Sequence, residues 1–368
     1  MLYFILLLFL VLVFPIMIFT PYITRKTESF GVTIPEKLFY RDDFREMRKK
    51  YATQTFFLSI LLIVIYTASY FFVKGDENLV SIIFTVILMA YIIISFFIYL
   101  KFHRLMRLKK DKEKWLDEQL QTTVIHTKFR EQRLTISHWW YVIPFILTIG
   151  LIAIMFIFYD KIPNEIPMNY NLSGEVTSWK EKSYATVLMM PILQLFFVFM
   201  FLFINVIIAR SKQQISPNNP EKSLQQNIIF RRRWSIFLYL SLYGLIFLFT
   251  FMQLGTYFFT MNKILFMAVP LIVSLVTILG VMILAITTGQ GGSRVKISSA
   301  DGKEAVNRDD DKYWKLGQFY FNKNDPAIFV EKRFGVGWTM NFGRPLGWII
   351  FLGMIGLPIV IMVVLSNL

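Results

Sequence analysis

Apolar runs of about 20 residues recur along this chain, and they constrain its fold more than any other feature. A run of this length is what an α-helix needs to cross the hydrocarbon core of a bilayer. Hydrophobic residues fill 55% of the 368 positions, and 38 residues are Phe. The sequence therefore predicts an all-α membrane fold, a polytopic bundle of about eight transmembrane helices with a small β-containing C-terminal segment. The expected spans are 2–23, 53–73, 79–100, 139–159, 184–209, 234–254, 264–287 and 346–365.

The basic residues alternate from loop to loop. The segments 25–52, 101–138, 210–233 and 288–344 hold 34 of the 39 Lys and Arg residues. By the positive-inside rule these four segments face the cytoplasm, so both termini and the loop 162–182 lie outside a cell membrane. In a chain this apolar, a net charge of +15 indicates contact with the anionic inner leaflet, and with a cytoplasmic regulator, rather than with nucleic acid.

Residue types that carry catalysis are sparse. Cysteine is absent, and neither a G-x-S-x-G motif nor a complete nucleotide loop occurs. His103, His126 and His138 are too far apart for a metal motif and are interpreted as ordinary loop residues. Asp309, Asp310 and Asp311 lack the calcium-loop spacing and are expected to begin a solvated helix. The sequence predicts no enzyme activity, no cofactor and no metal site.

The loop 162–182 is the most specified connection between two spans. Its prolines hold the start of the loop extended, and the run 171–174 is typical of a tight turn. Trp179 follows as an aromatic anchor where the chain re-enters the membrane. The loop is either a site that recognises an extracellular peptide or envelope ligand, or a structural connector. Its candidate ligand-binding residues are Pro163, Pro167, Asn169, Tyr170, Asn171, Gly174, Glu175, Trp179 and Lys180.

The same loop carries a family resemblance. Its pattern is I-P-x-x-I-P-x-N-Y-N-x-x-G-E-x-x-x-W-K. With the flanking spans, it resembles the bacterial membrane domain of unknown function found in SdpI-type immunity proteins. The chain departs from that family's pattern at Asn169, Val176 and Thr177, where the family has His, Pro and Asp. The resemblance implies a membrane protein with an immunity or signalling role.

The stretch 309–347, expected in the cytoplasm, resembles a second small, uncharacterised domain that ends such proteins. The residues that carry the resemblance are D-x-x-Y-W, F-Y-x-N-x-x-D-P and G-x-G-W-T-x-N-F-G. We expect strands at 316–321 and 327–332 around a turn, and a third strand or a glycine-bent interfacial segment at 334–343.

The spans contain no charged residue in their interiors, which disfavours a proton relay or an ion pathway. Gln194 and Asn205 share one face of the fifth span, where they either line a polar cavity or hydrogen-bond a neighbouring helix.

Four domains are expected. They are an N-terminal membrane region (1–138), an SdpI-like four-span domain (139–287), a cytoplasmic aromatic-rich segment (288–345) and a final helix (346–368). The leading hypothesis is non-enzymatic recognition of a peptide, toxin or envelope ligand at the outer face. A permease or flippase-like transporter, and a structural subunit of a membrane complex, are the alternatives.

Overall fold

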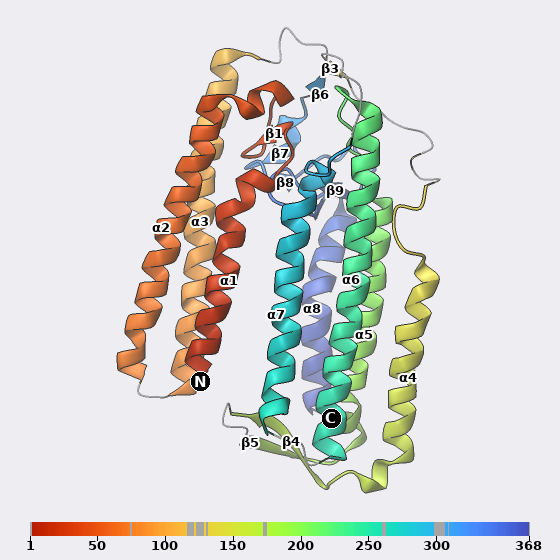
Figure 1. The fold of residues 1–368 in the computed structure, drawn as a ribbon. Coiled ribbons are helices and arrows are strands. Elements are labelled where there is room, and N and C mark those ends of the chain that lie inside the picture. Colours follow the sequence, from red (N-terminus) through yellow and green to blue (C-terminus); the bar gives the residue numbers. More distant parts are fainter. Residues whose placement is uncertain are drawn as a thin grey trace. The chain divides into compact units, whose positions relative to one another are not determined.

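The computed structural model describes residues 2–73, 76–115, 121–122, 129, 132–171, 175–259, 263–297, 306–307 and 309–367. Helices dominate the described part of the chain (Figure 1). They are α1 (Leu2–Ile23), α2 (Asp42–Val73), α3 (Glu77–Glu113), α4 (Val142–Ile157), α5 (Tyr184–Arg210), α6 (Pro220–Tyr257), α7 (Lys263–Thr288) and α8 (Pro345–Asn367). Short 3-10 helices are Glu36–Tyr40, His138–Tyr141, Tyr159–Lys161, Gln290–Gly292 and Asp311–Tyr313.

Seven helices of the described part are long and apolar enough to cross a bilayer, in agreement with a multi-pass membrane protein. The sequence predicts about eight spans. The eighth falls on α8, whose apolar stretch Pro345–Ile361 is shorter than the other seven. The predicted span 53–73 is part of α2, which begins earlier, at Asp42 in the basic segment, and continues without a break to Val73.

The strands form five two-stranded pairs among the described residues, and four of the pairs are antiparallel. The predicted strand 316–321 is wrong in its first half, because Leu316 and Gly317 have φ of 53° and 68° and form the turn between β7 and β8. The pairs are β1 (Glu28–Ser29) with β2 (Val32–Thr33), β3 (Gln121–Thr122) with β6 (Val306–Asn307), β4 (Glu165–Tyr170) with β5 (Val176–Glu181), β7 (Trp314–Lys315) with β8 (Phe319–Tyr320), and β9 (Phe329–Glu331) with β10 (Trp338–Met340).

The chain divides into two compact units. Unit 1 comprises Met1–Leu134, Arg210–Arg231 and Val281–Gly347, and unit 2 comprises Thr135–Ala209, Arg232–Gly280 and Trp348–Leu368. Each unit combines segments that are far apart in sequence. In this division the segments 210–231 and 281–347 belong with the N-terminal region.

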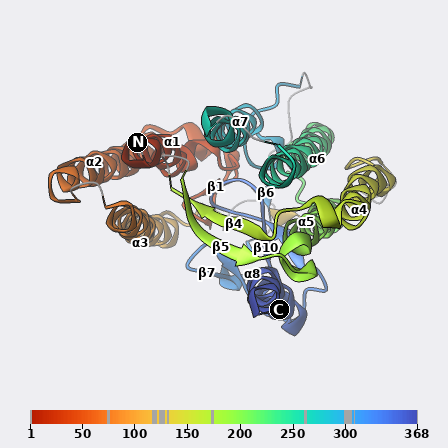
Figure 2. The ribbon, with the colours of Figure 1, turned by 90° about the horizontal axis from the view of Figure 1, so that it is seen from below.

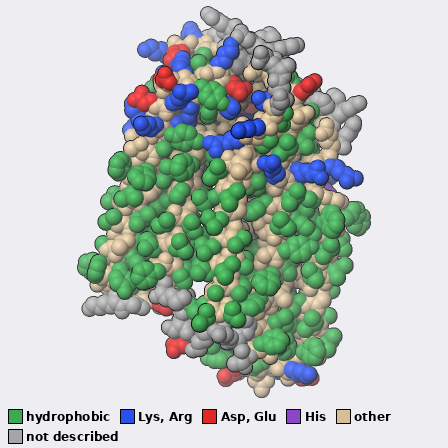
Figure 3. Space-filling model, viewed as in Figure 1, with side chains coloured by type: hydrophobic (Ala, Val, Ile, Leu, Met, Phe, Trp, Pro, Cys, Tyr) green, Lys and Arg blue, Asp and Glu red, His purple; other side chains and the backbone are tan. Residues whose placement is uncertain are grey.

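In unit 1, α1, α2 and α3 pack together as a helical layer (Figure 2). Tyr91 of α3 stacks on Phe14 of α1 at 3.9 Å and donates a hydrogen bond to the carbonyl oxygen of Phe14 at 2.7 Å. Buried Tyr hydroxyls need such partners in an apolar environment. Beyond this layer, Lys and Arg side chains gather at the end of unit 1 that holds its short strands, whereas hydrophobic side chains cover its helices (Figure 3).

In unit 2, the cores lie between α4, α5 and α6. One core contains Tyr141, Val198, Phe201, Leu242 and Ile246. A second core, at the end that carries the β4–β5 hairpin, contains Leu151, Met155, Ile162, Ile166, Val187 and Tyr257. Because the second core includes residues of the loop 162–182, this loop is packed onto the helices of its own unit.

Candidate functional site

The loop 162–182 forms an antiparallel β-hairpin rather than an irregular connector. Glu165 lies opposite Glu181, Ile166 opposite Lys180, and Pro167 opposite Trp179. The register then shifts by a bulge near Asn169, which increases the local twist of the pair. At the base of the hairpin, the Lys182 amide donates to the carbonyl oxygen of Asn164 at 2.8 Å.

One face of the hairpin anchors it to unit 2. Ile162 and Ile166 are both 2% exposed and pack in the core that α4, α5 and α6 share. Tyr170 extends this anchor, because its ring lies 4.6 Å from that of Phe266. The alternation of buried and exposed positions along a strand then directs the neighbouring side chains outward.

The turn of the hairpin is closed by two of the predicted site residues. The Asn171 amide side chain donates to Glu175 Oε2 at 2.9 Å, and the Glu175 backbone amide donates to Asn171 Oδ1 at 2.8 Å. Both side chains therefore stabilise the turn. Gly174 lies outside the described residues.

Asn169 is exposed but bonded across the strands, since its side-chain amide donates to Ser178 Oγ at 2.9 Å. Pro163 is exposed before β4, and Lys180 is half-buried opposite Ile166. The hairpin thus brings the predicted site residues together, but it uses most of them to hold its own shape.

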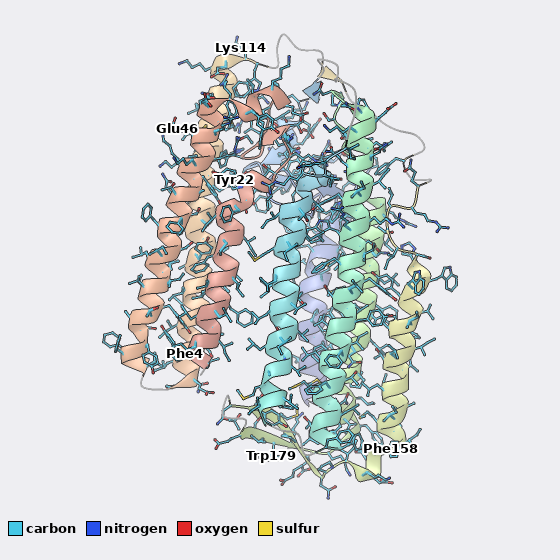
Figure 4. The ribbon with its side chains drawn as sticks, viewed as in Figure 1. Phe4, Tyr22, Glu46, Lys114, Phe158 and Trp179 are labelled. Carbon is cyan, nitrogen blue, oxygen red and sulfur yellow. The ribbon has the colours of Figure 1, made fainter. Side chains whose placement is uncertain are left out.

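The outward face of the hairpin holds a different set of side chains. Trp179 is 55% exposed and lies on the strand beside the helix ends of unit 2 (Figure 4). Two residues away on the same face, Glu181 lies directly opposite Glu165, and both carboxylates are exposed. Within the described part of the chain neither carboxylate has an ion-pair partner. Like charges directly opposite on a strand pair are destabilising, so this arrangement costs stability.

The two amide side chains of α5, Gln194 and Asn205, bond to elements of unit 2. Gln194 is fully buried and donates to Thr250 Oγ1 of α6 at 3.3 Å. Asn205 donates to the carbonyl oxygen of Ile136 at 3.1 Å and accepts from Ser235 Oγ at 2.6 Å. These contacts correspond to the helix-bonding alternative for the two residues.

A buried ionic network in unit 1 was not predicted. Glu331 of β9 is ion-paired with Arg25, which follows α1, and with Arg231 of α6 at 3.0 Å. The side chains of Glu331 and Arg231 are fully buried. Asn227 joins the pair by donating to Glu331 Oε1 at 2.8 Å and accepting from Arg231 Nε at 2.7 Å. The network ties three distant segments of the chain together.

A second buried group surrounds Arg333. Its guanidinium is ion-paired with Asp310 and Asp311, and Lys110 of α3 bonds both Asp309 and Asp311 at 2.6 Å. Burial alone would raise the pKa of Asp311, but Arg333 and Lys110 outweigh burial and hold this pKa well below its usual range. As predicted, these aspartates begin a helix, the short 3-10 helix Asp311–Tyr313. The expectation that they are merely solvated is wrong, because Arg333 and Lys110 pair with them.

Glu28 of β1 lies beside both groups. Burial raises its pKa to about 7, against the opposing effect of Arg25 and Arg333. Its Oε2 atom is buried and has no hydrogen-bond partner in the described part of the chain. Glu28 therefore takes up a proton close to neutral pH.

His103 also differs from its prediction as a loop residue. It lies on α3, is 5% exposed, and its Nδ1 atom is 2.8 Å from the carbonyl oxygen of Phe30. His138 lies in a 3-10 helix, and His126 is outside the described residues. α3 continues to Glu113, beyond the predicted span 79–100, and this extension places His103 on a helix.

Two families match parts of the chain. The "Domain of unknown function (DUF1648)" matches residues 146–195, which include the hairpin. The "Family of unknown function (DUF5808)" matches residues 323–348, which include β9 and β10. Both predicted resemblances to uncharacterised domains are confirmed at this level, and neither match names an SdpI-type protein. No curated protein and no solved structure is detectably similar to the chain.

Proposed function

We propose that this chain is a non-enzymatic, multi-pass membrane protein that binds a cationic peptide on the outward face of the β4–β5 hairpin, in an immunity or signalling role. The supporting observation is the opposed, exposed pair Glu165 and Glu181 beside the exposed Trp179. Two carboxylates that have no ion-pair partner in the described part of the chain attract an ammonium or guanidinium group, and an indole face attracts the same cations.

The repulsion between the two carboxylates lowers the stability of the hairpin, and this favours a ligand-binding role for them over a structural one. A connector gains nothing from like charges opposite each other, whereas a bound cation would relieve their repulsion. The hairpin is also ordered before any ligand binds, because Ile162 and Ile166 fix it to the core of unit 2. Such preorganisation reduces the entropy lost on binding.

The proposal requires the hairpin to face the outside of the cell. The chain has no cysteine, so a single introduced cysteine reports its own accessibility. We expect Thr177→Cys on β5 to react with a membrane-impermeant maleimide in intact cells. Lys112→Cys, in a basic segment assigned to the cytoplasm, should react only after the cells are opened. The reverse pattern would exclude an outer binding face.

Binding is tested with the full chain in nanodiscs of neutral lipid. Tetralysine should bind and tetraglutamate should not, with an affinity that falls as salt is added because exposed charges are screened. Removing both carboxylates by Glu165→Gln and Glu181→Gln should weaken tetralysine binding about tenfold, or about 1.4 kcal/mol.

Asp160→Asn is the matched control for the binding test. Asp160 is an exposed carboxylate just before the hairpin and is not on its outward face. It should leave the affinity within about twofold. Equal binding of tetralysine by the double variant would overturn the proposed site. Peptide accumulation inside proteoliposomes would instead favour the permease alternative.

A further inference from the structure

Unit 1 contains a large polar cavity of about 870 Å³. Three parts of the chain frame it: the residues after α1, the start of α6, and the end of α7 with the segment that follows. Ligand sites for small molecules are commonly 300–1,000 Å³. The cavity is therefore large enough for a whole ligand rather than a single ion.

The cavity is strongly basic. Among the described residues, five basic side chains line it, Arg25, Lys26, Lys222, Arg294 and Lys296, and one carboxylate does so, that of Glu36. Arg25 is already ion-paired with Glu331, which it shares with Arg231. In the described residues no carboxylate pairs with Lys26, Lys222 or Lys296, so three positive charges face the space without a counter-ion.

The wall of the cavity is built by close backbone contacts. After α7, Gly291 and Gly292 have φ of 61° and 81°. A Cβ atom on Gly291 would lie 2.4 Å from the Arg25 guanidinium, and one on Gly292 would lie 2.1 Å from the carbonyl oxygen of Gln226. The Gln226 side chain in turn donates to the carbonyl oxygen of Val295 at 2.8 Å. These contacts fix the segment that carries Arg294 and Lys296.

Neutral donors complete the lining. Ser216, Asn218 and Ser223 line the same space, and the Asn218 side chain donates to Glu36 Oε2 at 3.4 Å. Hydroxyl and amide groups beside unpaired lysines are the groups that surround phosphate oxygens in proteins, because they donate hydrogen bonds while the ammonium groups supply charge.

The cavity lies beside the ends of the apolar helices α1 and α7. Ile286 and Thr287, in the last turn of α7, line it, and Arg25 and Lys26 follow the apolar helix α1. Helix ends of this kind meet the headgroup region of a bilayer. A phosphate attached to a lipid would therefore reach the lysines from the membrane side.

We propose that this cavity binds a phosphate-bearing anion through Lys26, Lys222 and Lys296, either an anionic phospholipid headgroup or soluble phosphate. This site does not depend on the peptide-binding role of the hairpin.

The test uses the purified full chain in a neutral detergent and follows its unfolding temperature and ligand affinity. The probes are phosphatidylglycerol against phosphatidylcholine, and inorganic phosphate against chloride at equal ionic strength. We expect phosphatidylglycerol or inorganic phosphate to raise the unfolding temperature. Lys222→Gln with Lys296→Gln should weaken binding of that probe at least tenfold, and Lys222→Arg with Lys296→Arg should retain it.

Lys49→Gln with Lys112→Gln is the matched control, since both lysines are exposed, belong to unit 1 and lie outside the cavity lining. This pair should bind like the wild type. Stabilisation by phosphatidylglycerol alone would assign the site to a lipid headgroup, and stabilisation by inorganic phosphate would assign it to a soluble ligand. A response to neither probe, or an equal loss in the control pair, would overturn the proposal. The hairpin variants leave these lysines intact, so the two proposals fail separately.

Discussion

The end of unit 1 that holds its short strands and the hairpin of unit 2 both carry clustered charges. The charges are paired in unit 1, whereas two carboxylates on the hairpin are not paired with any residue that the structure describes. Three carboxylates of this region of unit 1, those of Glu331, Asp310 and Asp311, are paired with buried guanidinium groups. On the hairpin, the exposed Glu165 and Glu181 lie opposite each other and have no ion-pair partner among the described residues. Charges that are buried and matched hold segments together, whereas exposed like charges are available to a ligand. The comparison therefore assigns a structural role to the ion pairs of unit 1 and a ligand-binding role to the carboxylates of the hairpin.

The largest effect is expected for Glu331→Gln, which tests whether the ion pairs of unit 1 are structural. The substitution removes the charge that compensates Arg25 and the fully buried Arg231. Breaking a buried pair by removing one partner typically costs about 3–5 kcal/mol. We expect a loss of this size in the free energy of unfolding, measured by denaturant titration in detergent. Asp111→Asn, at an exposed position of the same unit, should change it by less than about 0.5 kcal/mol. Equal effects would show that the network is not structural.

A second prediction concerns Glu28. Its pKa of about 7 in the folded state lies above the value of about 4.3 expected in an unfolded chain. The proton bound by the folded state therefore stabilises it fully below pH 4.3, and this contribution is lost as the pH rises to 7. Comparing wild type with Glu28→Gln isolates this group from all others that titrate. The variant should gain relative stability between pH 5 and pH 8, by up to about 3 kcal/mol. A constant difference across this range would contradict the burial of an unpaired carboxyl.

The smallest effect is expected on the hairpin. Glu181→Gln removes the repulsion with Glu165 and should raise the free energy of unfolding by about 0.2–1 kcal/mol. The gain should shrink in 1 M salt, which screens exposed charges. Asp160→Asn should produce no such gain. A loss of stability in Glu181→Gln would mean that the carboxylate serves the fold, and the contrast with unit 1 would disappear.

The helices were predictable because their signal is local. Twenty apolar residues in a row suffice to indicate a span, whatever they pack against. Boundaries were harder where polar residues remain helical. α6 begins at Pro220 within the predicted basic loop, since proline suits the first turn of a helix.

The candidate site was predicted only in part. Prolines, a turn and Trp179 marked the loop, but the cross-strand register that opposes Glu165 and Glu181 depends on pairing between β4 and β5. The ionic network of unit 1 had no local signal at all. Arg25 and Glu331 are 306 residues apart, and neither stands in a recognisable motif. Such contacts arise only when the chain has folded.

The matched segment 323–348 has a further property that follows from its buried charges. Asn341 holds its backbone together through bonds to the carbonyl oxygens of Asn322 and Ala327. Yet Glu331 and Arg333 within it find their counter-ions on residues outside the segment. If the segment 323–348 were separated from the rest of the chain, Glu331 and Arg333 would lose their counter-ions. The segment is therefore not an independently folding module. A protein that contains it has to supply the counter-ions from other parts of its chain.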